Sequence, residues 1–212
     1  MMKKFLILFI LILACKSSFA AEPLTPQQKQ QAVATISKAV SELKYMQCIF
    51  VQTKYMSMLN DRLVSYGTMY YCQPGKLRWE YTRPYDYLFI FNGAKVYVGN
   101  KTRKNIIDTG TNKLFREIAN IMMSTVTGKA LTNAEEFSID IDAEQNMWRV
   151  TLVPKKKEMK RMFQRVVLYF LSKEALITKI ELYEKNGDKT EIKMTDVKTN
   201  TKIDEVHFNI PL

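Results

Sequence analysis

The sequence predicts an α+β protein: a single strongly curved antiparallel sheet of about 11 strands, with two amphipathic helices covering its mouth. Three observations lead to this prediction. Apolar and polar residues alternate in many short segments from Met46 onward, and turn signals such as Asn92-Gly93 separate those segments. Two longer stretches show helical spacing instead. A sheet with this many strands must curl to cover its apolar face.

Composition limits the function. The chain has 212 residues, of which 47% are hydrophobic, so it fits one globular domain and is not disordered. One histidine and three cysteines leave little for a zinc site or a His-based triad, and nucleophile-turn, phosphate-loop and zinc-protease motifs are absent. We therefore predict a protein without enzymatic activity, metal or cofactor. The net charge of +11 makes the chain distinctly basic.

The N-terminus has the pattern of a secretory signal. Lys3 and Lys4 precede an apolar run over residues 5–14, and small residues follow. We predict a signal peptide over residues 1–20 and one domain over residues 21–212, exported to the periplasm and separated from nucleic acid. Cleavage after Ala20 would give a soluble protein, whereas the lipobox-like Leu13-Ala14-Cys15 would give a lipid anchor on Cys15; the sequence favours the soluble form.

Two amphipathic helices are expected to form the lid. Thr25 supplies an N-cap and Pro26 a first helical residue, and apolar residues then recur at spacings of three and four as far as Leu43. A second apolar stripe lies between Asn112 and Thr125. The residues that we assign to the underside of the lid are Val33, Ile36, Val40, Phe115, Ile118 and Met122.

The strands supply the candidate cavity. In segments such as 137–142 and 148–152, apolar residues alternate with polar ones, which is typical of a sheet with one dry and one solvated face. The predicted cavity residues are Phe50, Met58, Met69, Leu77, Trp79 and Tyr81. The alternative is that the same side chains fill an ordinary core.

A turn at Asn60-Asp61 would bring Cys48 and Cys72 nearly opposite each other on neighbouring strands. In an oxidising compartment the two cysteines could then form a disulfide. Two buried free thiols are the alternative, and the sequence does not decide between them.

Three polar features have ordinary interpretations. The basic run over residues 155–161 fits a solvated hairpin tip, and electrostatic attraction to an anionic membrane or an acidic partner is the functional alternative. His207, in an expected terminal strand, has no evident catalytic partner. Asp140, Asp142 and Glu144 alternate with apolar residues, which favours a solvated strand face over a metal site.

The order and spacing of several motifs resemble the periplasmic outer-membrane lipoprotein carrier (LolA) family over essentially the whole exported chain. The motifs are Phe50-Val51-Gln52, Gly67-x-Met69, residues 73–84 (QPGKLRWEYTRP), Asn92-Gly93, the helix at 114–129, Asp196-Val197 and residues 208–211 (FNIP). The resemblance implies a single strongly curved antiparallel sheet that forms an unclosed β-barrel, with amphipathic helices as a lid over a hydrophobic cavity. It also implies a carrier that takes lipoprotein acyl chains from an inner-membrane transporter to an outer-membrane acceptor. We expect a monomer.

One position departs from the best-studied branch of that family. An arginine there precedes the motif's proline and ties the lid shut, whereas this sequence has Gln73. Gln73, Arg78 and Arg83 are therefore the candidates for an alternative latch.

The competing function is a membrane-tethered acceptor or general lipid-binding protein of the same shape, anchored through Cys15. A third alternative, an exported lipid or glycan hydrolase, would need a nucleophile, and the sequence contains none that we recognise.

Overall fold

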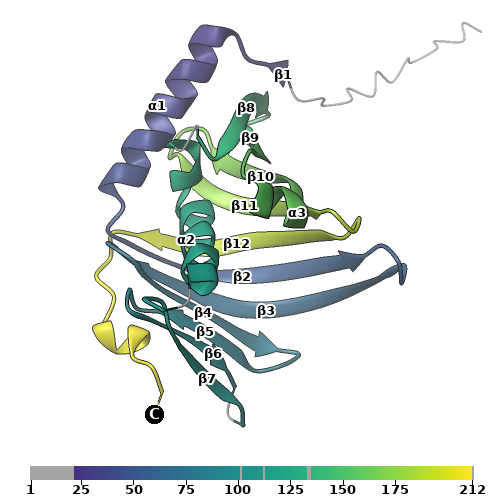
Figure 1. Cartoon of the computed structure of the whole chain (residues 1–212). Helices are drawn as coiled ribbons and strands as arrows, with labels where there is room; N and C mark the ends of the chain where they lie inside the picture. The colour runs from purple at the N-terminus through teal and green to yellow at the C-terminus, as the bar shows by residue number, and fades with distance from the viewer. Residues whose placement is uncertain (1–21, 101, 112, 133–134, 212) are drawn as a thin grey trace, which may run out of the picture.

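The computed structural model describes residues 22–211 except 101, 112 and 133–134; the side chains of residues 22, 113–118 and 132 are also outside the description. All described strands join one antiparallel sheet in the order β1-β8-β9-β10-β11-β12-β2-β3-β4-β5-β6-β7 (Figure 1). β1 has only two residues (Glu22–Pro23). The longer strands are β2 (Tyr45–Met56), β3 (Asp61–Cys72), β4 (Lys76–Arg83), β5 (Tyr87–Phe91), β6 (Lys95–Gly99), β7 (Lys104–Asp108), β8 (Phe137–Glu144), β9 (Met147–Pro154), β10 (Phe163–Leu171), β11 (Leu176–Glu184) and β12 (Lys189–Thr199).

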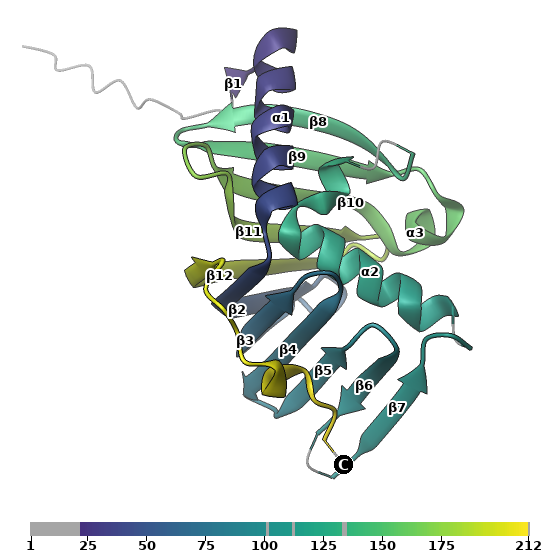
Figure 2. The same ribbon diagram turned by 90° about the vertical axis from the view of Figure 1, so that its left-hand side faces the viewer.

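The sheet is curved and unclosed, because β1 and β7 end the strand order and do not pair with each other. Figure 2 shows the two halves of the sheet, β8–β12 and β2–β7, bending toward the same side. The predicted fold class and the count of about 11 strands are confirmed. Among the described residues no helix is long and apolar enough to cross a membrane.

Helix α1 (Pro26–Glu42) begins where the sequence predicts it. The Thr25 hydroxyl accepts a hydrogen bond from the Gln28 backbone N–H, and the Gln28 side chain accepts one from the Thr25 N–H, which forms a capping box. α2 (Lys113–Thr127) follows β7, and the 3-10 helix η1 (Lys129–Thr132) follows α2. The turn between them uses Gly128, whose φ of +82° is the left-handed conformation that ends many helices.

Two short helices occupy places where the sequence suggested other structure. The basic run forms α3 (Lys157–Met162) between β9 and β10, where we expected a plain hairpin tip. His207 lies in the 3-10 helix η2 (Glu205–Phe208), capped by Asp204, and not in a terminal strand. The ring of His207 stacks on Tyr70 with centroids 4.3 Å apart, so its described contact is structural.

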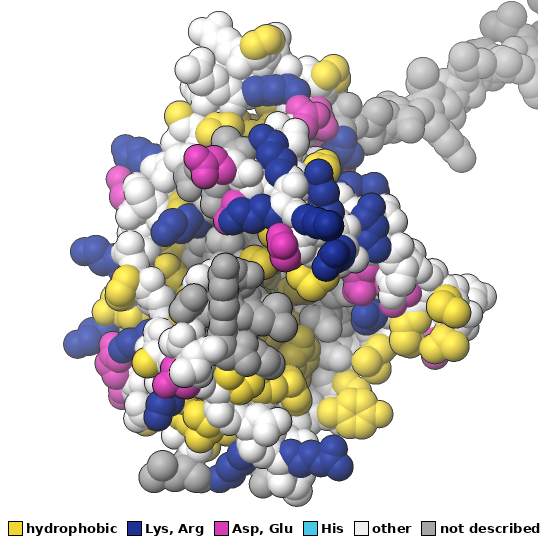
Figure 3. All heavy atoms as spheres, in the orientation of Figure 1, with side chains coloured by type: hydrophobic (Ala, Val, Ile, Leu, Met, Phe, Trp, Pro, Cys, Tyr) yellow, Lys and Arg dark blue, Asp and Glu magenta, His cyan; other side chains and the backbone are white. Residues whose placement is uncertain are grey.

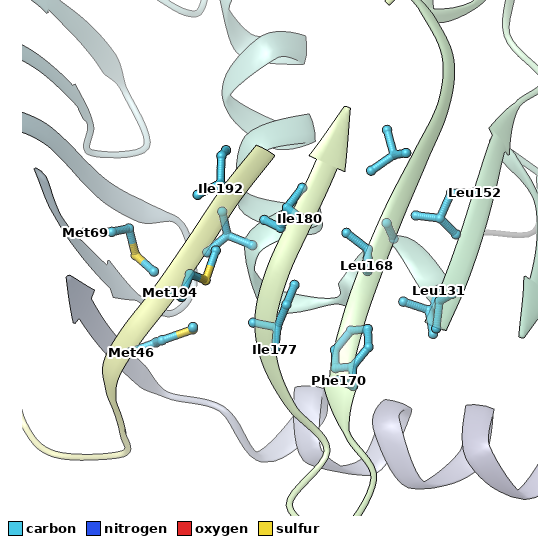
Figure 4. Packing of buried hydrophobic residues seen from close by; sticks show 14 of the residues in the cluster. Met46, Met69, Leu131, Leu152, Leu168, Phe170, Ile177, Ile180, Ile192 and Met194 are labelled. Carbon is cyan, nitrogen blue, oxygen red and sulfur yellow. The ribbon is translucent and has the colours of Figure 1, made fainter. Parts of the chain in front are cut away.

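One hydrophobic cluster fills the concave side of the sheet and continues into the helices. It receives side chains from β2, β3, β4 and β8–β12, as well as Ile36 of α1 and Ala119 and Val126 of α2. Figure 4 shows how Met194, Ile180, Leu168 and Leu152 project from neighbouring strands into this shared interior. The two helices therefore provide part of the burial that an open sheet cannot supply by itself.

Candidate functional site: the concave face and its helical cover

An aromatic cluster stands at the centre of the concave face. Phe50 of β2 lies 4.4 Å from Trp79 and 5.3 Å from Tyr81 between ring centroids, the second pair edge to face. The Tyr81 hydroxyl donates to Gln52 at 2.9 Å, and burial raises the pKa of that hydroxyl. The indole N–H of Trp79 is buried beside the Tyr81 hydroxyl and lowers the pKa of that hydroxyl, although the pair lacks full hydrogen-bond geometry. The cluster therefore presents a continuous apolar surface with one weakly paired donor.

Gly67 makes the position of the Phe50 ring possible. It pairs with Phe50 across β2 and β3, and a Cβ at residue 67 would lie 2.4 Å from Cζ of Phe50 and 2.0 Å from the backbone oxygen of Glu80. Only glycine leaves room for both. The glycine of the Gly67-x-Met69 motif therefore leaves the space that the Phe50 ring occupies.

The structure places five of the six predicted cavity residues on or beside this surface. Phe50, Met69, Leu77 and Trp79 are buried in the central cluster, and Tyr81 packs against it half-buried. Met58 is a correction: it is 91% exposed in the turn between β2 and β3. The turn occupies residues 57–60 and lies two residues earlier than predicted, so Met58 falls at the tip instead of inside a strand.

The same shift decides between the two alternatives for the cysteines, because it separates them too far for a cross-strand disulfide. Cys48 pairs with Met69 and Cys72 with Tyr45, so the two cysteines lie three residues apart in register and on opposite faces of the sheet. Both are free and buried. Burial raises the pKa of the Cys48 thiol to about 12, which keeps it protonated and unreactive at neutral pH.

α2 lies across the concave face. It contacts β11 on one side and β6 on the other, and the five strands from β12 to β5 lie between these two in the sheet order. Figure 1 shows α2 in front of the central strands. Met122 is half-buried against the cluster, as expected for a lid, whereas the side chains of Phe115 and Ile118 lie outside the described residues.

α1 covers one end of the same cluster. Ile36 is fully buried, and Val33 and Val40 are half-buried against the cluster, which agrees with the predicted stripe. The two helical elements meet at Gly128, where an added Cβ would lie 2.9 Å from the Phe170 ring and 3.4 Å from Val40. We call α1 and α2 together the lid.

Polar ties hold α1 at its two ends. Lys29 forms an exposed ion pair with Asp140 of β8, and this contact raises the pKa of Lys29 and lowers that of Asp140. At the other end the Asn200 side chain accepts from the Lys44 N–H at 2.7 Å and donates to the Glu42 carbonyl at 3.2 Å. An exposed ion pair contributes only about 0–1 kcal/mol, so most of the lid's attachment is apolar.

Among the residues whose side chains the structure describes, the predicted latch residues contact groups outside the lid. Arg78 lies on the convex face, because it alternates with Leu77 and Trp79, and it binds Glu80 at 2.8 Å and the His207 carbonyl at 3.2 Å. Arg83 stacks on Tyr66, 4.4 Å from the ring centroid. Gln73 is exposed, although its backbone N–H donates to the Lys44 carbonyl at 2.8 Å beside the end of α1. These contacts place Arg78 and Arg83 against groups outside the lid, and the latch stays a prediction.

Three methionines of the interior were missed. Met46 and Met194 are buried on the concave face, beside the predicted Met69, and Met123 of α2 packs against the same cluster from above. Their alternation with polar neighbours on β2 and β12 was the available signal. Methionine is unbranched and polarisable, so these side chains suit an apolar surface that must adapt its shape.

The segment with Asp140, Asp142 and Glu144 forms β8, as its alternation suggested. Arg149 of β9 pairs with Asp142 at 2.9 Å and approaches Glu144 at 3.9 Å. Cys15 and the predicted signal over residues 1–20 lie outside the described residues.

Fold and site together define a class of protein: an open antiparallel sheet whose apolar concave face is covered by helices. Residues 41–211 match the family model described as outer membrane lipoprotein carrier protein LolA, so this chain belongs to the LolA family. The resemblance found in the sequence is thereby confirmed.

Relatives and solved structures agree with this membership. The chain is 26% identical to a protein of Methylococcus capsulatus over 208 residues, covering 98% of this chain and 93% of the relative. It is also 26% identical to a protein of Legionella pneumophila strain Corby, covering 95% and 91%. Both are named outer-membrane lipoprotein carrier protein.

Two solved structures share the fold at low identity. One is an uncharacterized conserved protein from Thermus thermophilus, with a TM-score of 0.54 and 10% identity, covering 86% of this chain and 93% of that one. The other is a Pseudomonas aeruginosa MucA/MucB complex, with a TM-score of 0.52 and 10% identity. The match covers 85% of this chain and 60% of the chain in that complex.

Proposed function

We propose that this protein carries lipoproteins across the periplasm by enclosing their acyl chains between the concave face and the lid. The observation that carries the proposal is the placement of α2: it covers a row of buried apolar side chains from β11 to β6 without being part of the sheet. Membership of the LolA family and the names of the relatives support the carrier role.

In the empty protein the lid occupies the place of the cargo. Leu77 and Trp79 are buried when the lid is closed, so acyl chains can reach them only if α2 moves away. Burying an acyl chain contributes about 0.8 kcal/mol per methylene, which would exceed what reversible transfer tolerates unless another apolar group competes. The lid is that competitor, because its own apolar face returns to the sheet after release.

The N–H of Trp79 fits this proposal. It is buried beside the Tyr81 hydroxyl without full hydrogen-bond geometry, and a poorly paired buried donor costs free energy in the closed state. The ester and amide carbonyls that join acyl chains to a lipoprotein's terminal cysteine are acceptors of the right kind. When cargo enters, these carbonyls would lie among otherwise apolar groups. The Trp79 N–H could then donate a hydrogen bond to one of them while the acyl chains contact the aromatic cluster.

We further propose that the chain is exported, loses residues 1–20, and receives cargo from an inner-membrane lipoprotein-releasing transporter before an outer-membrane acceptor takes it. Lipidation of Cys15 would instead give a membrane-tethered acceptor. Mass spectrometry of the mature N-terminus separates the two forms: a free Ala21 supports the shuttle, and a diacylglyceryl-modified Cys15 supports the tethered protein.

The enclosure itself can be tested with the tryptophans. The chain has two, Trp79 in the cluster and Trp148 on β9, so Trp148→Phe leaves Trp79 as the only indole. We expect a soluble lipopeptide with brominated acyl chains to quench Trp79 fluorescence, and the same peptide without acyl chains to leave it unchanged. Unchanged fluorescence with a bound lipopeptide would show that the acyl chains lie elsewhere.

A further inference from the structure

The β2–β3 turn exposes apolar side chains where a hairpin tip is ordinarily polar. Met58 is 91% exposed and Leu59 is 70% exposed, and they are adjacent residues at the end of the two longest strands of the sheet. Tyr55 and Leu63, on the strands just behind the tip, are also exposed. Single exposed apolar residues are common, but a contiguous group at a projecting tip marks a contact surface.

Contacts between loops join this tip to the basic segment of the chain. The Ser57 N–H donates to Asp188 at 3.0 Å and its hydroxyl to the Asn186 carbonyl at 3.3 Å, which attaches the tip to the β11–β12 turn. The Lys185 N–H of that turn donates to the Met162 carbonyl at 2.9 Å, at the end of α3. The tip, the β11–β12 turn and α3 therefore form one continuous rim.

The rim is cationic next to its apolar tip. Residues 155–161 contain five lysines and arginines and one glutamate, and Lys157, Lys160 and Arg161 are exposed. Arg62 and Lys185, beside the tip, are exposed as well. Figure 3 shows Lys and Arg side chains gathered above the apolar group at the right-hand edge of this face.

We propose that this rim binds the surface of an anionic lipid bilayer, with Met58 and Leu59 inserted among the acyl chains and the lysines and arginines facing lipid phosphates. The rim fits a bilayer because its apolar part is a projecting wedge of two side chains. Such a wedge enters a fluid interface without needing a shaped pocket. Apolar insertion combined with several cations is the arrangement that gives reversible surface binding.

The inference goes beyond the proposed carrier function, since it concerns the outside of the protein and requires no bound cargo. It assigns a role to the basic segment that the concave face does not use. It also orients the molecule: the ends of β2 and β3 would face the bilayer, on the side of the sheet opposite η2 and the C-terminus (Figure 1).

The test is co-sedimentation of the purified empty protein with vesicles that contain no lipoprotein. We expect binding to vesicles of equal parts phosphatidylethanolamine and phosphatidylglycerol, and about tenfold weaker binding to phosphatidylcholine vesicles. Met58→Asp with Leu59→Asp should weaken binding to the anionic vesicles at least about tenfold, and Lys160→Gln with Arg161→Gln should remove most of the preference for anionic lipid.

Val206→Asp is the matched control, because Val206 is 58% exposed in η2, away from the rim, and should bind as the unaltered protein does. Equal binding by the Met58/Leu59 variant would overturn the proposal. A dimer in sedimentation velocity that becomes a monomer in this variant would also overturn it, and would assign the tip to a second copy of the chain. The tryptophan test above uses soluble lipopeptide without vesicles, so failure of one proposal is distinct from failure of the other.

Discussion

Replacing Gly67 by alanine tests whether the aromatic cluster depends on a bare backbone at that position. The new Cβ would lie 2.0 Å from the Glu80 backbone oxygen and 2.4 Å from Cζ of Phe50. The Glu80 oxygen belongs to the backbone of the neighbouring strand, and the Phe50 ring is fully buried, so moving either of them costs free energy. Strand β4 or the Phe50 ring must therefore move.

The expected loss follows from what moves with them. Overpacking a well-packed site costs about 1–3 kcal/mol. Displacing Phe50 also weakens its contacts with Trp79 and Tyr81, each worth about 0.5–1.5 kcal/mol. We expect Gly67→Ala to lower the free energy of unfolding by about 3 kcal/mol or more, which is a large share of the roughly 5–15 kcal/mol of a typical domain.

Urea denaturation followed by circular dichroism measures this loss, and Gly75→Ala is the control. A Cβ at residue 75 would have its nearest neighbour, the Phe91 ring, at an ordinary 3.9 Å. That substitution should be neutral or stabilising by up to about 1 kcal/mol, because alanine restricts the unfolded chain. Phe50→Leu should recover part of the loss in the Gly67→Ala background. Equal stability of the two alanine variants would refute the steric argument.

Three further predictions concern the lid and the convex face. Gly128→Ala should destabilise the protein by about 1–3 kcal/mol in thermal unfolding, because φ is +82° and the added Cβ meets the Phe170 ring at 2.9 Å. Ile36→Ala should cost about 2–4 kcal/mol and, if α1 moves with cargo, tighten lipopeptide binding; an unchanged Kd would show that α1 stays in place. Burial of Glu181 tends to raise its pKa, but a 3.0 Å hydrogen bond from Lys189 and other contacts lower the pKa below the ordinary 4.5. The ionised Glu181 therefore stabilises the fold fully above pH 4.5, and this stabilisation is lost as the pH falls through the lowered pKa. Glu181→Gln should lower the free energy of unfolding by about 1–2 kcal/mol at pH 7. It should also reduce the loss of stability at acidic pH when the free energy of unfolding is measured against pH.

The sheet and the first helix could be predicted because their signals are local. The Thr25 cap and the apolar stripe through Ile36 specify α1 without reference to the rest of the chain. Strict alternation likewise placed Leu77 and Trp79 on one face, because side chains along a strand alternate whatever the strand's partners are. These are properties of short segments, and the structure retains them.

Register could not be predicted in the same way. Asn60 has a φ of +48° and ends the β2–β3 turn, whereas the prediction took Asn60-Asp61 as its centre. A turn signal identifies a residue that tolerates the left-handed region, but not its position within the turn. The error of two residues placed Met58 inside the cavity and Cys48 opposite Cys72. Arg78 was named as a latch candidate because it is near Gln73 in the sequence, but nearness in sequence does not give the face of the sheet on which a side chain lies.

The strand order has a consequence for how this protein is made. β2 is among the first strands in the chain and β12 is the last, yet they pair at the centre of the sheet, where Phe50 meets Met194. The two halves of the sheet pair with each other only through β12 and β2, although α2 also contacts both halves, so the sheet is continuous only after β12 has been synthesised. If the chain crosses a membrane from its N-terminus, the sheet would stay incomplete until the final strand emerged. We expect chaperones to bind the unfolded chain during that interval.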